Sequence, residues 1–124
     1  MSLRSVLLVC AGGILGTAAR LGLSLVIPDA DGLPLATLIA NVAGALLIGI
    51  LTARVPATSP LRLLLGTGAL GGFTTYSALA VGSVTLWADA PLLAIGYALG
   101  SVALGIAAAA VGLRIGRPRS RSVS

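Results

Sequence analysis

Four apolar stretches fill almost all of this 124-residue chain, and each is long enough to cross a bilayer. A membrane-spanning helix needs about 20 apolar residues, and the stretches cover residues 3–27, 33–54, 63–88 and 91–113. The connections between them are short and contain Pro, Gly or Asp, which is typical of turns. We therefore predict an all-α membrane protein with four transmembrane helices in a single domain over residues 1–115.

The composition argues against a soluble or disordered chain. The sequence is 57% hydrophobic and 9% charged, whereas soluble domains carry about 25% charged residues. Disordered chains are charge-rich and poor in apolar residues. The net charge of +5 could indicate nucleic-acid binding, but the basic residues are separated by long apolar runs rather than gathered on a wet face. We expect a lipid bilayer as the surroundings and no nucleic-acid partner.

The charged residues predict the orientation of the chain. With four spans, the N-terminus, the second connection and the C-terminus share one side of the membrane. That side receives seven arginines: Arg4, Arg54, Arg62, Arg114, Arg117, Arg119 and Arg121. The opposite side receives Asp29, Asp31 and Asp89. Because short cytoplasmic segments are enriched in Lys and Arg, we predict that both termini are cytoplasmic, with a disordered basic tail over residues 116–124.

The third stretch contains a segment that disfavours a continuous helix. Its middle reads Gly71-Gly72-Phe73-Thr74-Thr75-Tyr76-Ser77, and adjacent glycines followed by β-branched threonines both weaken a helix. We predict a break near the bilayer midplane, where free carbonyls persist only if protein buries them or a site uses them. The alternative is a continuous helix whose hydroxyls bond preceding carbonyls.

A few polar side chains lie inside the spans and are candidates for function. Asn41 lies midway along the second span, with Thr37 one turn earlier on the same face, and Arg20 is the only charge well inside a span. Ser77 and Ser101 add hydroxyls. A buried amide requires partners, so Asn41 either bonds another helix or lines a polar path. An intramembrane Arg is a functional candidate, although its head can also extend to the interface.

The residue types that are absent narrow the function further. No carboxylate or His lies within a span, so a proton-coupled exporter, the first alternative, lacks a proton carrier. No nucleophile–base pair, metal-ligand cluster or phosphate loop is present, which argues against an enzyme. The polar inventory consists mostly of hydrogen-bond donors and therefore suits an anion. A non-transporting assembly subunit is the second alternative, but it would leave the predicted break and Asn41 without a purpose.

Three segments resemble the Fluc/CrcB fluoride channel family of small four-helix membrane proteins. They are Gly12-Gly13-Ile14-Leu15-Gly16-Thr17-Ala18-Ala19-Arg20, Pro34-Leu35-Ala36-Thr37-Leu38-Ile39-Ala40-Asn41-Val42-Ala43-Gly44 and the Gly71–Ser77 segment. The resemblance covers nearly the whole chain. It implies a passive channel of the bacterial inner membrane that exports fluoride from the cytoplasm. It also implies an antiparallel dimer with a structural, untransported Na⁺ at its centre, held by the main-chain carbonyls of Gly71 and Thr74.

The resemblance further implies an anion path formed by Asn41, Tyr76, Ser77, Ser101, Thr37 and Arg20. The chain departs from the family pattern in this region. The usual Thr-Thr-Phe-Ser-Thr-Phe is here Thr74-Thr75-Tyr76-Ser77-Ala78-Leu79, and Leu79 lacks the positive ring edge that could face an anion. One turn after Ser101 stands Gly105. These departures predict that one pore lining of this subunit is degraded.

The arginine distribution indicates whether the second subunit of the dimer is identical to this chain. An antiparallel homodimer requires one sequence to insert in both orientations, which needs a balanced distribution of basic residues. This chain is strongly biased. We therefore hypothesise a heterodimer with a related subunit of opposite orientation, and the homodimer is the alternative.

Overall fold

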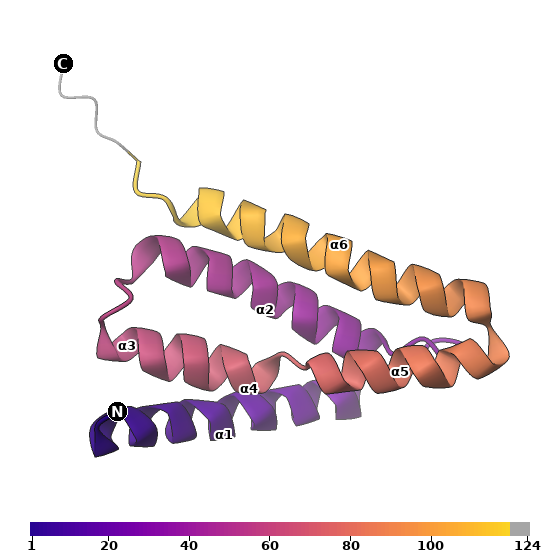
Figure 1. Ribbon diagram of the computed structural model, residues 1–124, viewed down its shortest axis with the longest axis horizontal. Coiled ribbons are helices and arrows are strands. Elements are labelled where there is room, and N and C mark those ends of the chain that lie inside the picture. Colours follow the sequence, from indigo (N-terminus) through magenta and orange to yellow (C-terminus); the bar gives the residue numbers. More distant parts are fainter. Residues whose placement is uncertain (120–124) are drawn as a thin grey trace.

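The structure is a computed structural model that describes residues 1–119, and its spans are built from helices (Figure 1). The elements are α1 (Leu3–Val26), α2 (Leu35–Arg54), α3 (Pro60–Arg62), the π-helical segment η1 (Leu63–Leu70), α4 (Gly71–Phe73), α5 (Tyr76–Asp89) and α6 (Pro91–Gly116). Four helical stretches are long and apolar enough to cross a membrane: Leu3–Val26, Leu35–Arg54, Pro60–Asp89 and Pro91–Gly116. The prediction of a four-helix, multi-pass membrane protein is confirmed.

Local sequence explains where several helices begin and end. Ser2 and Ser59 accept hydrogen bonds from the backbone N–H groups of Ser5 and Leu61, so they cap the starts of α1 and α3. The last helix runs to Gly116, so the predicted tail of residues 116–124 begins within its final turn. Residues 120–124 of that tail lie outside the described part of the chain.

The N-terminus and the C-terminal end of α6 lie at one end of the molecule, together with the connection between α2 and α3 (Figure 1). Two arginines at this end close helix C-termini. Arg54 Nε donates to the carbonyl of Gly116 at 2.9 Å, and Arg62 Nη1 donates to the carbonyl of Val55 at 2.7 Å. Cations are favourable at helix C-termini, so these arginines stabilise the fold.

The subunit consists of helix pairs brought together by glycine. α1 lies against η1 and α4, and α2 lies against α6. At Gly12 and Gly16 of α1, a Cβ atom would collide with the carbonyls of Leu64 and Ala69. At Gly49 of α2, it would collide with the carbonyl of Ala109. Small residues that admit a neighbouring backbone are the usual means of tight helix packing in lipid.

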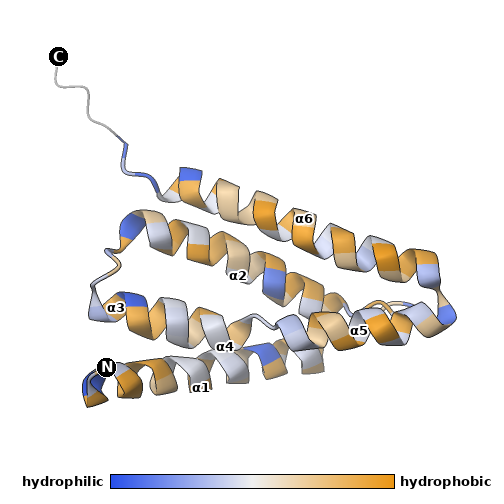
Figure 2. Ribbon diagram, in the orientation of Figure 1, coloured by the Kyte–Doolittle hydropathy of each residue, from blue (hydrophilic) through white to orange (hydrophobic). Residues whose placement is uncertain are grey.

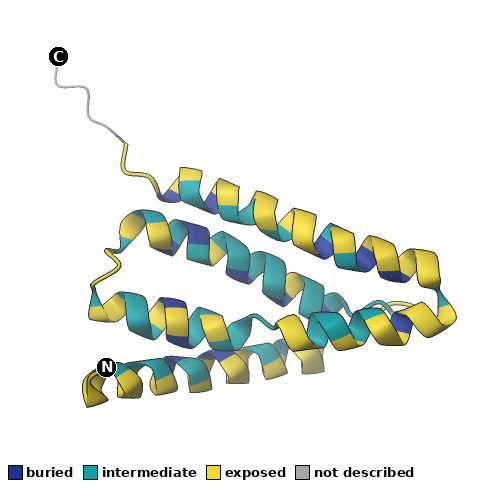
Figure 3. Cartoon of the chain, in the orientation of Figure 1, coloured by how far each residue is buried: buried dark blue, intermediate teal, exposed yellow. Residues whose placement is uncertain are grey.

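Many large apolar residues are exposed, and hydrophobic and exposed positions recur along all the long helices (Figures 2 and 3). Within residues 1–119, the buried hydrophobic residues are Ala36, Ala40, Leu51, Leu86, Ala94 and Tyr97. A water-soluble domain of this size would not leave so much apolar surface exposed. The surface therefore faces lipid or another protein.

The third helix is broken, as predicted, but the glycines do not cause the break. Gly71 has ordinary helical angles (φ −62°, ψ −37°), and the chain leaves the helix at Thr74 (φ −82°, ψ 155°) and Thr75 (φ −149°, ψ 118°). Gly72 instead permits contact with α1, because a Cβ there would lie 2.5 Å from the carbonyl oxygen of Gly13. The threonines and their partners on other helices hold the break.

Candidate functional site at the helix break

Asn41 of α2 holds one side of the break through two hydrogen bonds. Its Nδ2 donates to the carbonyl of Thr75 at 2.9 Å, and the N–H of Thr75 donates to Asn41 Oδ1 at 2.7 Å. The side-chain amide thereby replaces the backbone partners that Thr75 would have in a continuous helix. Of the two possibilities for Asn41, the structure supports bonding to another helix, while the second N–H on Nδ2 is left for another acceptor.

Arg20 and Thr17 of α1 reach the break from the other side. Arg20 Nε donates to the carbonyl of Gly72 at 3.3 Å, and Thr17 Oγ1 donates to the same oxygen at 3.5 Å. The two residues are three positions apart and therefore share one helical face. The half-buried Arg20 points at a helix end inside the protein.

Three other carbonyls at the break remain free. The carbonyl of Leu70 accepts from both the N–H and the hydroxyl of Thr74. Among residues 1–119, no hydrogen bond reaches the carbonyl oxygens of Gly71, Phe73 or Thr74. Free carbonyl oxygens are ligands that monovalent cations use in membrane proteins. The carbonyl oxygens of Gly71 and Thr74 are therefore ligands of a kind that fits a Na⁺. No His, Cys, Asp or Glu cluster in the described residues offers a competing metal site.

Polar groups beside the break face outward from the subunit. Tyr76 is 82% exposed, and Ser77 and Gly71 are exposed as well. Ser77 Oγ lies 3.2 Å from the hydroxyl of Thr75, which in turn accepts from the N–H of Ala78 and caps α5. Exposed hydroxyls and free carbonyls at this depth would be costly against lipid.

Sequence reasoning missed Tyr97, which forms a second polar cluster with Ser101 on α6. Both residues are almost fully buried, at 4% and 6% exposure. Within the described chain, neither hydroxyl has a hydrogen-bond partner. Thr37 of α2 is a polar neighbour of Tyr97. The available signal was a tyrosine one turn before Ser101 in an otherwise apolar span.

Tyr97 and Ser101 are among the residues that line a cavity of about 230 Å³. The other lining residues are Leu33, Leu38, Leu93, Gly96, Gly100 and Leu104. Gly96 and Gly100 have nothing within 4 Å of the place where a Cβ would stand, so this side of α6 is open. Leu79 packs against the apolar cluster of Leu86, Ala94 and Tyr97.

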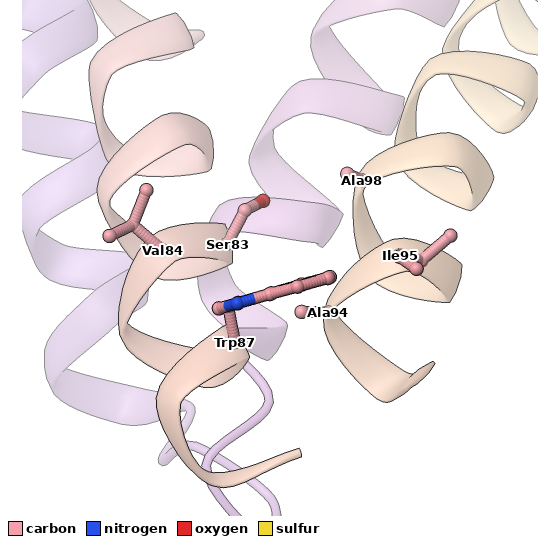
Figure 4. Close-up of a pocket in the computed structure, with 6 residues that line it drawn as sticks. All are labelled: Ser83, Val84, Trp87, Ala94, Ile95 and Ala98. Atoms are coloured by element: carbon pink, nitrogen blue, oxygen red, sulfur yellow. The ribbon is translucent and has the colours of Figure 1, made fainter. Parts of the chain in front are cut away.

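The predicted site residues thus separate into two groups. Gly71, Thr74, Asn41 and Arg20 meet at the break, and Tyr76 and Ser77 follow it directly. Thr37 and Ser101 belong with Tyr97 instead. A further cleft of about 260 Å³ between α5 and α6 has an almost entirely apolar lining, with the Trp87 ring extending towards Ala94 (Figure 4). It offers an ion no comparable set of donors.

Comparison with known proteins identifies the family. Residues 7–113 match the family described as CrcB-like protein, Camphor Resistance (CrcB). The chain is 45% identical to the "Fluoride-specific ion channel FluC" of Paracoccus denitrificans, over 88% of this chain and 91% of that protein. It is 41% identical to "Fluoride-specific ion channel FluC 2" of Leifsonia xyli subsp. xyli, over 91% and 83%. It is 43% identical to "Fluoride-specific ion channel FluC 2" of Bacillus subtilis, over 88% and 85%.

These relatives are named as channels and not as enzymes, which agrees with the absence of a catalytic pattern in the sequence. The matched region includes all three segments that carry most of the site, residues 12–20, 34–44 and 71–77. The chain therefore belongs to the CrcB family, the family of the Fluc fluoride channels.

Proposed function

We propose that this chain is a subunit of a fluoride-specific channel that lets fluoride leave the cytoplasm passively and so reduces its toxicity. The observation that carries the proposal is the 45% identity, over most of both chains, to a protein named as a fluoride-specific ion channel. The chemistry of the spans supports it, because their interiors offer hydroxyls, an amide and an arginine but no carboxylate or His. Such a lining suits an anion and lacks a carrier for protons.

In this proposal fluoride moves past the hydroxyls of Thr37, Tyr97 and Ser101 and then past the break. A buried hydroxyl without a partner costs about 1–3 kcal/mol, and an anion supplies the acceptor that Tyr97 and Ser101 lack. The second N–H of Asn41 and the hydroxyls of Tyr76 and Ser77 continue the series of donors. Arg20 adds positive charge near the break.

The exposed polar groups at the break support an antiparallel dimer. Tyr76, Ser77 and the free carbonyls of Gly71 and Thr74 need cover at membrane depth. An apolar groove of about 320 Å³ between α2 and η1 adds surface that a partner could fill. A partner of opposite orientation would meet this face with its own break, and both sets of carbonyls could hold a structural Na⁺ that is not transported.

The arginine bias supports a heterodimer in a bacterial inner membrane, with both termini of this chain in the cytoplasm. Seven arginines belong to the termini and the second connection in the sequence. Arg54 and Arg62 also bond helix ends there, and an orientation bias accounts for the excess of positive charge on that side. A related subunit with the opposite bias would complete the pores.

Fluoride efflux from liposomes tests the proposed function directly. We expect the protein, reconstituted with its partner subunit, to release fluoride to an electrode and to release no chloride under the same gradient. Protein-free liposomes are the control for leak. Release of both halides at similar rates would contradict a fluoride-specific channel, and release of neither would contradict a channel.

The orientation can be predicted separately. Because of the arginine bias, a cysteine tag at the C-terminus of a Cys10→Ser background should react with an impermeant thiol reagent from the cytoplasmic side only. A variant with Arg114, Arg117, Arg119 and Arg121 replaced by Gln should lose part of this preference. Equal labelling from both sides of the unmodified chain would contradict the fixed orientation and favour the homodimer.

Removing the buried hydroxyls should slow fluoride without unfolding the subunit. We expect Tyr97→Phe and Ser101→Ala each to lower fluoride efflux about 5- to 10-fold, which corresponds to a hydrogen bond of about 1–1.5 kcal/mol. Ser83→Ala is the matched control, since Ser83 Oγ bonds its own helix at Leu79 and lies in the apolar cleft. Unchanged efflux in both variants would place the fluoride path elsewhere.

A further inference from the structure

We propose that Arg20 is a positioning residue: with Thr17 it holds the C-terminal end of the first half of the third helix, and so determines which carbonyls at the break stay free. The proposal relies on the proposed function only for the identity of the cation that uses those carbonyls. It differs from the place in the anion path that the family resemblance implies for Arg20. Its basis is the pair of hydrogen bonds from Arg20 and Thr17 to the carbonyl oxygen of Gly72.

The break creates a helix end that needs partners. The first half of the helix, from Pro60 to Phe73, ends inside the protein. The last carbonyls of any helix lack intrahelical donors, and they carry partial negative charge that attracts a cation. Water satisfies such groups at a protein surface, but inside a membrane the protein itself must supply the donors.

The donors at this helix end are unevenly distributed. Leu70 accepts from the N–H of Thr74 at 3.0 Å and from its hydroxyl at 2.9 Å. Gly72 accepts from α1, whereas within residues 1–119 the carbonyls of Gly71, Phe73 and Thr74 accept nothing. Side chains from another helix therefore select which carbonyls remain available.

The two flanks of Thr74 are held from different helices. Arg20 and Thr17 bind the Gly72 carbonyl from α1, and Asn41 binds both backbone groups of Thr75 from α2. Fixing both flanks fixes the peptide planes between them, including the plane that carries the Thr74 carbonyl. If either flank were released, the carbonyls of Gly72 and Gly71 could exchange roles.

Arginine suits this position better than lysine. The donor that reaches Gly72 is Nε, which lies part way along the side chain in a planar guanidinium. Lysine keeps the positive charge but carries its donors only on a terminal ammonium. Arg20→Lys therefore retains the positive charge and removes the Nε donor that bonds the Gly72 carbonyl. The variant thus separates a positioning role from a general electrostatic effect.

The chain offers a matched control at another helix end. Arg54 Nε donates to the Gly116 carbonyl at 2.9 Å, at the C-terminus of α6. Arg54→Lys is thus the same chemical change on the same kind of hydrogen bond, made away from the break. Thr17→Val provides a second variant at the Gly72 carbonyl if Arg20→Lys does not fold.

The experiment measures the thermal stability of the purified channel against Na⁺ concentration, with N-methyl-D-glucamine keeping the ionic strength constant. We expect Arg20→Lys to raise the Na⁺ concentration for half-maximal stabilisation about tenfold, which is about 1.4 kcal/mol. Thr17→Val should raise it less, and Arg54→Lys should leave it unchanged. Hydrogen exchange of peptides covering residues 70–78 should quicken in Arg20→Lys and not in Arg54→Lys.

The outcomes separate this proposal from the proposed function. An Arg20→Lys channel with slower fluoride efflux but unchanged Na⁺ dependence and exchange would place Arg20 in the ion path and overturn the proposal. Unchanged values in all three measurements would also overturn it. If the thermal stability of the wild-type channel does not depend on Na⁺ concentration, the structural Na⁺ of the proposed function is contradicted. The hydrogen exchange of residues 70–78 in Arg20→Lys and Arg54→Lys then decides whether Arg20 holds the break.

Discussion

Asn41→Asp should abolish fluoride efflux, with a loss of at least about 100-fold. The amide now donates to the carbonyl of Thr75 and accepts from its N–H. A carboxylate has no donor, so one of its oxygens would face the Thr75 carbonyl at about the present hydrogen-bond distance. The second effect is a negative charge beside the proposed anion path, where two like charges 4 Å apart repel by about 4 kcal/mol at an effective dielectric constant of 20.

Two further measurements separate the loss of the hydrogen bonds between Asn41 and Thr75 from the effect of the added negative charge. Liposome efflux at neutral pH measures the loss, and Asn41→Ser is the uncharged comparison that also lacks the paired hydrogen bonds. Mild acidification should restore part of the Asn41→Asp efflux, because a protonated carboxyl carries one donor and one acceptor and can reproduce the pairing with Thr75. Protein-free liposomes at each pH correct for leak. Wild-type efflux in Asn41→Asp at neutral pH would show that Asn41 serves packing alone.

Alanine at the two adjacent glycines of the break should have opposite effects on the subunit. At Gly72, a Cβ would stand 2.5 Å from the Gly13 carbonyl oxygen and 3.0 Å from Thr17 Oγ1, and such overpacking costs about 1–3 kcal/mol. At Gly71 the nearest atom is the Gly66 carbonyl oxygen at 3.7 Å, an ordinary contact. Because Ala favours a helix over Gly by about 1 kcal/mol, Gly71→Ala should leave the subunit equally or more stable.

Thermal unfolding in detergent measures both variants, each serving as the other's control. Gly72→Ala should lower the unfolding temperature and also release Thr17 and Arg20 from the Gly72 carbonyl. The larger Gly71→Leu should keep the subunit folded but reduce the dimer in size-exclusion chromatography, because Gly71 is exposed beside the break. Equal stability of Gly71→Ala and Gly72→Ala would contradict the close approach of α1, and an unchanged dimer in Gly71→Leu would count against the proposed interface.

Much of the fold followed from pattern alone. The four spans were predicted because a bilayer permits only helices whose backbone groups are satisfied internally, and apolar length then suffices to find them. Sequence also predicted that the third helix breaks, and it assigned the cause to Gly71 and Gly72 together with the threonines that follow them. The structure places both glycines in helix and the break at the threonines. Asn41 of α2 supplies the partners of Thr75 there, and no local propensity contains that information.

The site was predictable as a set of residue types but not as a set of partners. The sequence identified Asn41 and Arg20 as unusual, because an amide and a charge in an apolar span need a reason. It could not reveal that Asn41 pairs with Thr75, 34 positions away, or that Arg20 reaches Gly72, 52 positions away. Tyr97 was overlooked for the same reason, because its burial with an unpartnered hydroxyl depends on neighbouring helices.

The sequence by itself therefore determined that this protein suits a membrane and has four apolar spans, because these properties follow from transfer free energies that each segment carries on its own. The tertiary structure alone decided which carbonyls at the break are bonded and which are free. That choice depends on donors contributed by α1 and α2 to the third helix, and hydrogen bonds between distant segments exist only once the helices have packed.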